Sequence, residues 1–126
     1  MKQLKTITLC CMLALLLVSL TGCGGKADEN KPMADVKAEA DKMDVAQLKA
    51  KAKSYYDAIM AKQEDINNLM AKVKEIPAAK LMSDEAKGLQ TDLSDLNKSL
   101  SNLKARFQVY YDKLKEKGGD TSGLQL

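Results

Sequence analysis

The stretch 45–76, VAQLKAKAKSYYDAIMAKQEDINNLMAKVKEI, decides the fold, because its apolar residues recur at alternating intervals of three and four. With Val45 at heptad position a, that position holds only Val, Ala and Ile, and position d holds Leu, Tyr, Ile and one lysine, Lys62. Such a seam is typical of a helix that packs against another helix. Pro77 follows, and the residue before a proline disfavours the helical conformation, so the helix is predicted to end at Ile76.

A second heptad series follows a short connection at 77–82. Ser83 is a good N-cap residue, and the two acidic residues after it suit the positive end of a helix dipole. From there the a and d positions are again apolar or aromatic, and lysines crowd the last turn before Gly118, where a C′ glycine is expected. We therefore predict helices over 44–76 and 83–117.

Two helices of similar length joined by a short link are expected to fold back antiparallel. If Ile76 faces Ala86, apolar residues meet along almost the whole seam, and Asp44 arrives beside Gly118. Start signals, stop signals and seam thus agree, as they should in a specified fold. The predicted fold class is all-α, an antiparallel two-helix hairpin of coiled-coil type over 44–117. This register gathers the aromatic residues near the termini: Tyr55, Tyr56, Phe107, Tyr110 and Tyr111. We expect them to form a packed layer; the other interpretation is a platform on which a sugar ring or another ligand stacks.

The N-terminal region has a different pattern. Two lysines near the start precede an apolar run at 7–20, which is shorter than the roughly 20 residues of a membrane-spanning helix. The run ends in Leu20-Thr21-Gly22-Cys23, an aliphatic residue followed by two small residues and a cysteine. This pattern resembles the lipobox of bacterial lipoprotein precursors. The other interpretation is a secreted protein with an accidental Leu-Thr-Gly-Cys.

The lipoprotein resemblance implies a processing path and a location. Residues 1–22 would be a signal peptide that is removed, and Cys23 would carry a diacylglycerol and a further acyl chain of the palmitate type. One acyl chain binds a membrane marginally, whereas two or three make a lasting anchor. The implied location is the bacterial cell envelope. In a cell with two membranes, the absence of Asp at Gly24 favours the outer membrane, facing the periplasm. A bacterium with one membrane is also compatible.

Residues 23–43 are predicted to be the lipidated cysteine and a tether. The part before Met33 has no apolar period and is expected to be flexible. From Met33 to Met43 the apolar spacing is helical, and Asp44 with Gln47 forms a capping-box pattern. Two structures remain open: a short separate helix, or continuation into the main helix. At the other end, 118–126 is predicted to be a flexible tail.

Composition excludes several classes of function. The chain has 20 basic and 17 acidic residues, and Lys2 and Lys5 belong to the N-terminal region, so the remainder is nearly neutral and nucleic acid is not an expected partner. Histidine is absent, and the only cysteines are Cys10, Cys11 and Cys23, so no metal site is expected. Neither paired carboxylates on an apolar face nor a phosphate-binding glycine loop is found. We expect no catalytic residues, no cofactor and no enzyme activity.

The leading hypothesis is a non-enzymatic envelope lipoprotein whose helical hairpin serves as a spacer or docking arm for another envelope component. Tyr56, Met60 and Met70 lie beside the seam and widen its apolar stripe. They could pack on a second copy or on another envelope protein, or they could be ordinary surface residues. The alternative is a carrier of hydrophobic ligands, or a chaperone-like binder, that uses this Met/Tyr surface.

Overall fold

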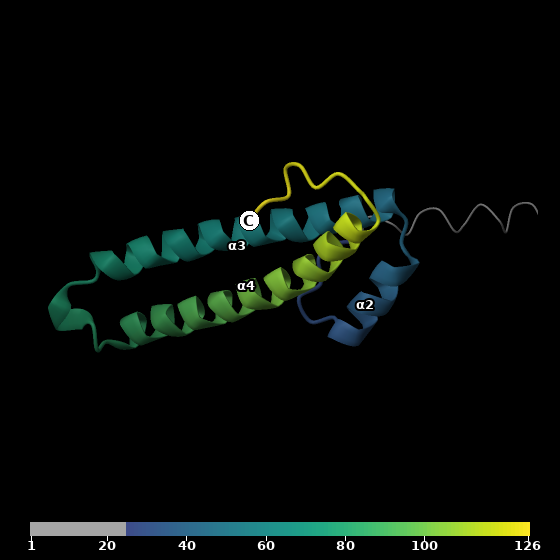
Figure 1. Ribbon diagram of the computed structural model, residues 1–126. Coiled ribbons are helices and arrows are strands. Elements are labelled where there is room, and N and C mark those ends of the chain that lie inside the picture. Colours follow the sequence, from purple (N-terminus) through teal and green to yellow (C-terminus); the bar gives the residue numbers. More distant parts are fainter. Residues whose placement is uncertain (1–24) are drawn as a thin grey trace, which may run out of the picture.

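The computed structural model describes residues 25–126, and this part of the chain is helical without a strand. Its elements are α2 (Met33–Lys42), α3 (Val45–Glu75), a single 3-10 turn η2 (Ala78–Lys80) and α4 (Asp84–Glu116). Helices α3 and α4 run side by side in opposite directions, and α2 packs on α4 where the long helices begin and end (Figure 1). The all-α prediction is therefore confirmed, with three α-helices in the described chain.

The break between α2 and α3 decides between the two structures that the sequence left open. Met43 and Asp44 are extended, and the Asp44 carboxylate accepts a hydrogen bond from the Gln47 backbone N at 2.8 Å. The Gln47 side chain accepts one from the Asp44 backbone N at 3.0 Å. This reciprocal pair is the predicted capping box, and it starts α3 as a separate helix.

The remaining helix ends follow the local signals in the sequence. Helix α3 stops before Pro77, and the Ser83 hydroxyl accepts from the Ala86 backbone N at 3.3 Å. Gly118, at a φ of 71°, donates to the Lys115 carbonyl, while Gly119 donates to the carbonyl five residues before it. These two bonds form a Schellman motif, which satisfies the last carbonyls of α4.

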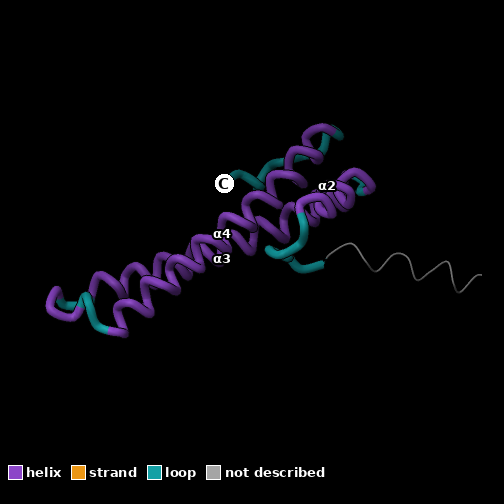
Figure 2. The backbone as a smooth tube through the Cα atoms, turned by 90° about the horizontal axis from the view of Figure 1, so that it is seen from below, coloured by secondary structure: helices purple, strands orange, loops and turns teal. Residues whose placement is uncertain are grey.

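The hydrophobic core fills only one end of the hairpin, which we call the three-helix end. Its buried residues come from all three helices and the C-terminal tail: Val36, Ala40, Met43, Leu48, Ala52, Tyr55, Ile59, Leu103, Phe107, Tyr110, Leu114 and Leu124. Figure 2 shows α2 against this end and the long pair continuing beyond it without a third helix. In that distal half, from residue 60 through the turn to residue 98, most seam residues are half-buried: Leu69, Val73, Ile76, Leu89, Leu93 and Leu96.

Two segments that were expected to be flexible pack against the helices instead. Residues 25–32 form hydrogen bonds with α3 and α4. In the tail, Leu124 is only 3 % exposed and Asp120 pairs with Lys49 at 2.7 Å. Gly119 lies so close to α3 that an added Cβ would meet Val45 Cγ1 at 2.9 Å. The structure thus corrects the expectation of a loose tether and tail.

Candidate functional site

The predicted lipidation site, Cys23, lies outside the described residues. The first described residue, Gly25, is already in contact with α3. Its carbonyl accepts hydrogen bonds from Lys51 Nζ and Ser54 Oγ, each at 3.4 Å. The chain is therefore held against α3 from the second residue after the predicted lipidation site.

Residues 25–32 are fastened to both long helices. The Tyr55 hydroxyl accepts from the Asp28 backbone N at 3.2 Å and donates to the Asp28 carbonyl at 3.0 Å. From α4, Arg106 Nε donates to the Lys31 carbonyl at 2.8 Å, and the Ser99 hydroxyl bonds the Glu29 carboxylate. We call residues 25–42, meaning this segment together with α2, the N-terminal clasp.

Glu39 on α2 is the point where the clasp and the hairpin meet. Its carboxylate accepts from Lys31 Nζ within the clasp and from the Tyr110 hydroxyl of α4 at 3.0 Å. Lys51 Nζ of α3 lies 3.6 Å from the other carboxylate oxygen. One side chain thus joins three helices and the preceding segment.

The surroundings of Glu39 keep it ionised. Partial burial acts to raise the pKa of Glu39, but the hydrogen bonds from Lys31 and Tyr110 and the charge of Lys51 outweigh it, so the pKa lies below 4.5. Burial, and then the bond to Glu39, raise the pKa of Tyr110. The phenol therefore keeps its proton and acts as a donor. Hydrogen bonds to charged groups are the stronger kind.

The aromatic residues gather at the three-helix end, as the register predicted. The rings of Tyr55 and Tyr110 stack with their centroids 5.4 Å apart, and Phe107 lies 6.3 Å from Tyr56 and 5.4 Å from Tyr111. Tyr55 and Tyr110 are completely buried. The cluster is therefore a packed layer and offers no open ring face of these two residues to a ligand.

Further pairs close the three-helix end. Lys117 Nζ donates to the Met43 carbonyl at 2.6 Å, just after the end of α2. Lys113 pairs with Asp41 of α2 at 2.8 Å, and this pairing lowers the pKa of Asp41. Positive charge at the carbonyl end of a helix is stabilising. Lys113 of α4 and Lys117 directly after it thus hold the C-terminal end of α2.

A groove continues from the clasp into the distal half of the hairpin. It has a volume of about 610 Å³ and begins at Glu29. Leu69 and Leu96 form its apolar part, while charged side chains from both helices line its rims. Lys62, the single polar d residue, lines the groove and is half-buried. This is the position of a lysine that lays its stem along the seam.

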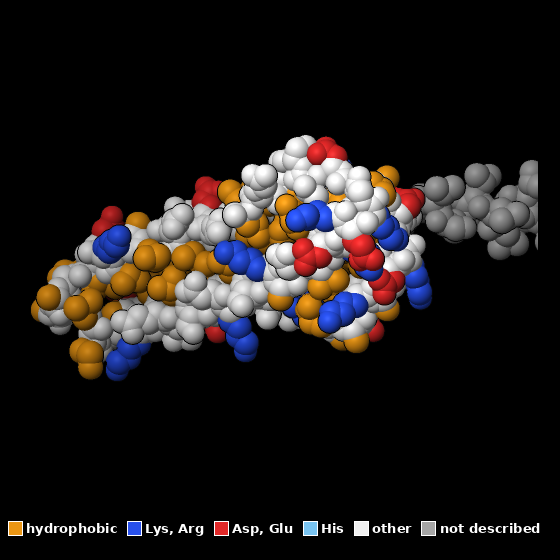
Figure 3. All heavy atoms as spheres, in the orientation of Figure 1, with side chains coloured by type: hydrophobic (Ala, Val, Ile, Leu, Met, Phe, Trp, Pro, Cys, Tyr) orange, Lys and Arg blue, Asp and Glu red, His pale blue; other side chains and the backbone are white. Residues whose placement is uncertain are grey.

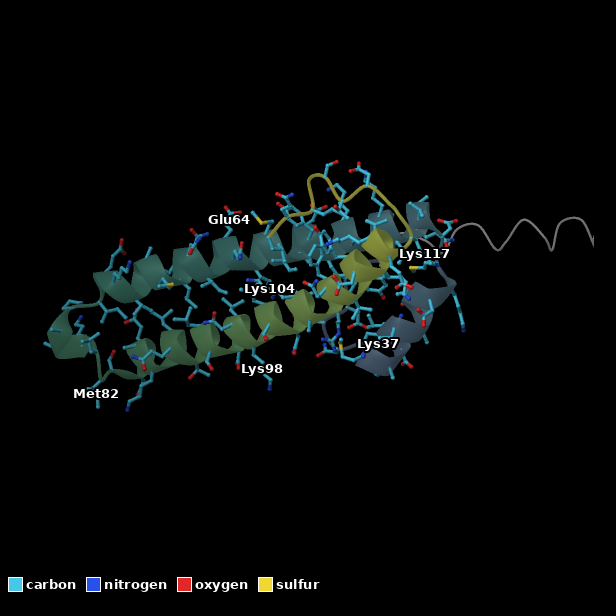
Figure 4. All side chains as sticks on the ribbon, in the orientation of Figure 1. Lys37, Glu64, Met82, Lys98, Lys104 and Lys117 are labelled. Atoms are coloured by element: carbon cyan, nitrogen blue, oxygen red, sulfur yellow. The ribbon has the colours of Figure 1, made fainter. Side chains whose placement is uncertain are left out.

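The distal half also exposes apolar side chains. Figure 3 shows a hydrophobic band between α3 and α4, from the turn to the middle of the molecule. Met60 and Met70 of α3 are 46 % and 41 % exposed. At the turn, Met82 is the most exposed large apolar residue in the described chain and lies at the far end from Lys117 (Figure 4). Met60 lies four residues before Glu64 and therefore on the outer side of α3. We call the half-buried seam residues, together with the exposed Met70 and Met82, the distal seam.

Several of the residues that join the clasp to the long helices carry no signal in the heptad pattern. Tyr110 was placed in the seam, but Glu39, Lys51 and Arg106 were not singled out. Lys51 and Arg106 share one flank of the hairpin, and each is only 8 % exposed. Two long basic side chains on one flank, together with a glutamate in the short helix before it, are the signal that could have predicted the packing of that helix on this flank.

Residues 25–126 contain neither a membrane-spanning helix nor a metal cluster. Over that range, no helix combines the length and the apolar character that crossing a bilayer requires. In the same part of the chain, histidine, cysteine, aspartate and glutamate side chains form no group of three or more that could hold a metal ion. Comparisons with protein-family models, curated proteins and solved structures found no match to this chain.

Proposed function

We propose that this chain is a bacterial envelope lipoprotein, anchored through lipid on Cys23 and without enzymatic activity. Its α3–α4 hairpin, of coiled-coil type, serves as a docking arm or spacer for another envelope component. One observation carries the docking part of the proposal. The seam between α3 and α4 is covered by the clasp and the tail at the three-helix end, but it lacks such cover in the distal half.

Burial of the distal seam by a partner would be favourable. Full burial of a methionine side chain is worth about 1.5–3 kcal/mol, so the exposed part of Met70, 41 % of the residue, represents about 0.6–1.2 kcal/mol. The half-buried seam residues add to this gain. Methionine also adapts to partners of different shape because its side chain is unbranched and flexible. Contiguous exposed apolar surface of this kind is typical of interaction sites.

The coiled-coil part of the proposal is supported by side-chain burial. The a and d residues Ile59, Ile66 and Leu103 are buried, as in a knobs-into-holes seam. The stacking partner of Tyr110 is Tyr55, three residues after Ala52, which the proposed register puts opposite Tyr110; both Tyr55 and Tyr110 are d residues of the seam. Near the turn, Ile76 and Leu89 line the same pocket.

The anchor is tested by replacing Cys23 with serine in the full-length chain expressed in a bacterium. The original chain should fractionate with membranes, and its N-terminal peptide should carry the mass of the lipid. The Cys23→Ser variant should lose both properties. An unmodified Cys23 in a membrane-free fraction would refute the lipoprotein assignment.

Docking is tested with a photo-crosslinking amino acid at Met70, in the distal seam. The matched control carries it at Glu64, which lies on the outer side of α3 (Figure 4). In intact cells we expect Met70 to capture one defined envelope protein that Glu64 does not capture. Equal capture from both positions, or capture from neither, would contradict a docking role for the seam.

The carrier of hydrophobic ligands remains the second candidate, because the groove volume is within the range of small-molecule sites. The observation against it is that Tyr55 and Tyr110 are buried against each other and cannot receive a ligand. Uptake of a fluorescent hydrophobic probe by the lipid-free chain, blocked by Leu69→Lys or Leu96→Lys, would favour the carrier over the arm.

A further inference from the structure

The N-terminal clasp leaves little free chain between the predicted anchor and the folded body. Gly25 is two residues after Cys23, and two extended residues span at most about 7 Å. Gly25 itself contacts Lys51 and Ser54 of α3. A long loose tether would allow the body a wide range of heights above the bilayer, whereas this chain allows almost none.

The contact point lies near one end of the hairpin. Counted from Val45, Lys51 and Ser54 are about 9 and 14 Å along α3, at 1.5 Å per residue. The turn at Ala78–Lys80 lies about 35 Å further along the same direction. The anchor is therefore attached to the three-helix end and far from the turn.

The clasp is held firmly enough to transmit this geometry. Asp28 is bonded through both its backbone N and O to a fully buried tyrosine, Tyr55. Glu39 ties α2 to both long helices, and Arg106 holds the chain just before α2. These bonds are spread over residues 25–42, so release of the body would require several of them to break together.

We propose that, in the lipidated protein, the N-terminal clasp seats the three-helix end directly on the lipid headgroups, so that the turn projects away from the bilayer. This inference rests on the proposed lipidation of Cys23. The surface that meets the headgroups is the end where Lys117, just after α4, donates to the carbonyls of Asp41 and Met43; Lys42 and Asp44 are the sequence neighbours of these two residues. It is charged and polar, which suits contact with a headgroup layer rather than insertion into it.

The outer side of α3 gives no reason for the hairpin to lie flat. There Lys53 is paired with Asp57 at 2.7 Å, and Glu64 follows on the same side. This side offers no net positive charge to anionic lipids, and basic clusters are what draw a helix onto such a surface. The apolar distal seam then stays free of lipid and accessible along an arm of about 45 Å.

The test uses full-length lipidated protein purified from bacterial membranes and placed in vesicles of phosphatidylcholine and phosphatidylglycerol. Cys10 and Cys11 leave with the signal peptide and Cys23 is acylated, so a cysteine introduced by mutation is the only free thiol. One variant carries a dye at the turn, Met82→Cys, and the other at the three-helix end, Glu116→Cys. Energy transfer to acceptors on the lipid headgroups gives the height of each dye.

A third variant separates the clasp from the anchor. Ten Gly and Ser residues are inserted between Gly24 and Gly25, which leaves every contact of the clasp in place. A flexible insert of ten residues has a mean end-to-end distance of about 18 Å. This insertion is combined with each labelled position.

We expect strong energy transfer from the Glu116 dye, and transfer from the Met82 dye that corresponds to about 45–50 Å. The insertion should weaken transfer from the Met82 dye most, because transfer falls steeply with height at about 45–50 Å, whereas it is almost complete for a dye close to the headgroups. Equal transfer from both dyes would mean that the hairpin lies flat and would overturn the inference. An insertion without effect would overturn it as well. If the protein does not float with vesicles at all, the lipidation itself has failed, and the proposed function falls together with this inference.

Discussion

Replacing Glu39 with alanine tests whether the N-terminal clasp is a real part of the folded domain. The change removes the acceptor for the Tyr110 hydroxyl and the partner of Lys31. A hydrogen bond to a charged group contributes about 1.5–3 kcal/mol, and the partly exposed Lys31 pair adds about 0.5 kcal/mol. Alanine returns a few tenths through its helix propensity. The expected net loss in the free energy of unfolding is about 2 kcal/mol.

The assay is urea and thermal unfolding of the lipid-free chain from Gly24 onward, followed by circular dichroism. For a domain of this size, 1 kcal/mol shifts the melting temperature by about 4–8 °C, so the Glu39→Ala midpoint should fall by about 8–16 °C. Glu64→Ala is the matched control, because Glu64 is exposed on the outer side of α3 (Figure 4), and it should change stability by less than about 0.5 kcal/mol. Equal midpoints for the two variants would refute the reasoning that Glu39 joins the clasp to the hairpin.

Three further predictions concern the same domain. Gly119→Ala should destabilise it by about 1–3 kcal/mol in urea unfolding, because the added Cβ would come within 2.2 Å of Leu114 Cδ1. The control Gly88→Ala meets open space and should stabilise α4 by up to about 1 kcal/mol. If Gly119→Ala were the more stable of the two variants, the close packing of Gly119 on Leu114 would be contradicted. Leu124→Ala should cost about 2 kcal/mol, because this side chain is buried, and an unchanged melting temperature would mean that the tail is loose in solution. The pKa of Glu39 is lower in the folded chain than in the unfolded chain, so its contribution to the free energy of unfolding is complete above about pH 4.5 and is lost as the pH falls through the folded-state pKa. The difference in stability between the original chain and Glu39→Gln should therefore shrink below about pH 4.5. A difference that grows there would show that folding does not lower this pKa.

The helix boundaries could be predicted because each is set by residues within a few positions of it. The capping box at Asp44, the N-cap at Ser83 and the glycine at Gly118 each act on neighbouring backbone groups. Such local chemistry is written in the order of residues and needs no knowledge of the fold. The aromatic layer was also predictable, because it follows from the antiparallel seam alone.

The clasp could not be predicted in the same way, because its main partners are backbone atoms. Tyr55 bonds the backbone of Asp28, and Arg106 bonds the carbonyl of Lys31. Every residue except proline offers the same backbone donor and acceptor, so their positions in the sequence leave no pattern. The same segment is polar and lacks an apolar period, and it was therefore interpreted as a flexible tether. The tail was misjudged for a related reason, since one buried leucine, Leu124, is too little to form a period.

The unequal distribution of the core links the fold to the proposed roles. At the three-helix end, α2 and the tail enclose the seam, so local opening there would break many buried contacts at once. In the distal half, only one seam joins α3 to α4, and Met60 and Met70 remain exposed. Local stability follows the density of buried contacts, so amide hydrogens near Ile76 and Leu89 should exchange faster than those near Leu48 and Leu114. A partner that covers the distal seam would supply the missing contacts and slow this exchange, whereas the three-helix end is already complete without one. The chain thus concentrates its own stability at the three-helix end, next to the proposed anchor, and the far part of the α3–α4 pair is the part that a proposed partner would stabilise.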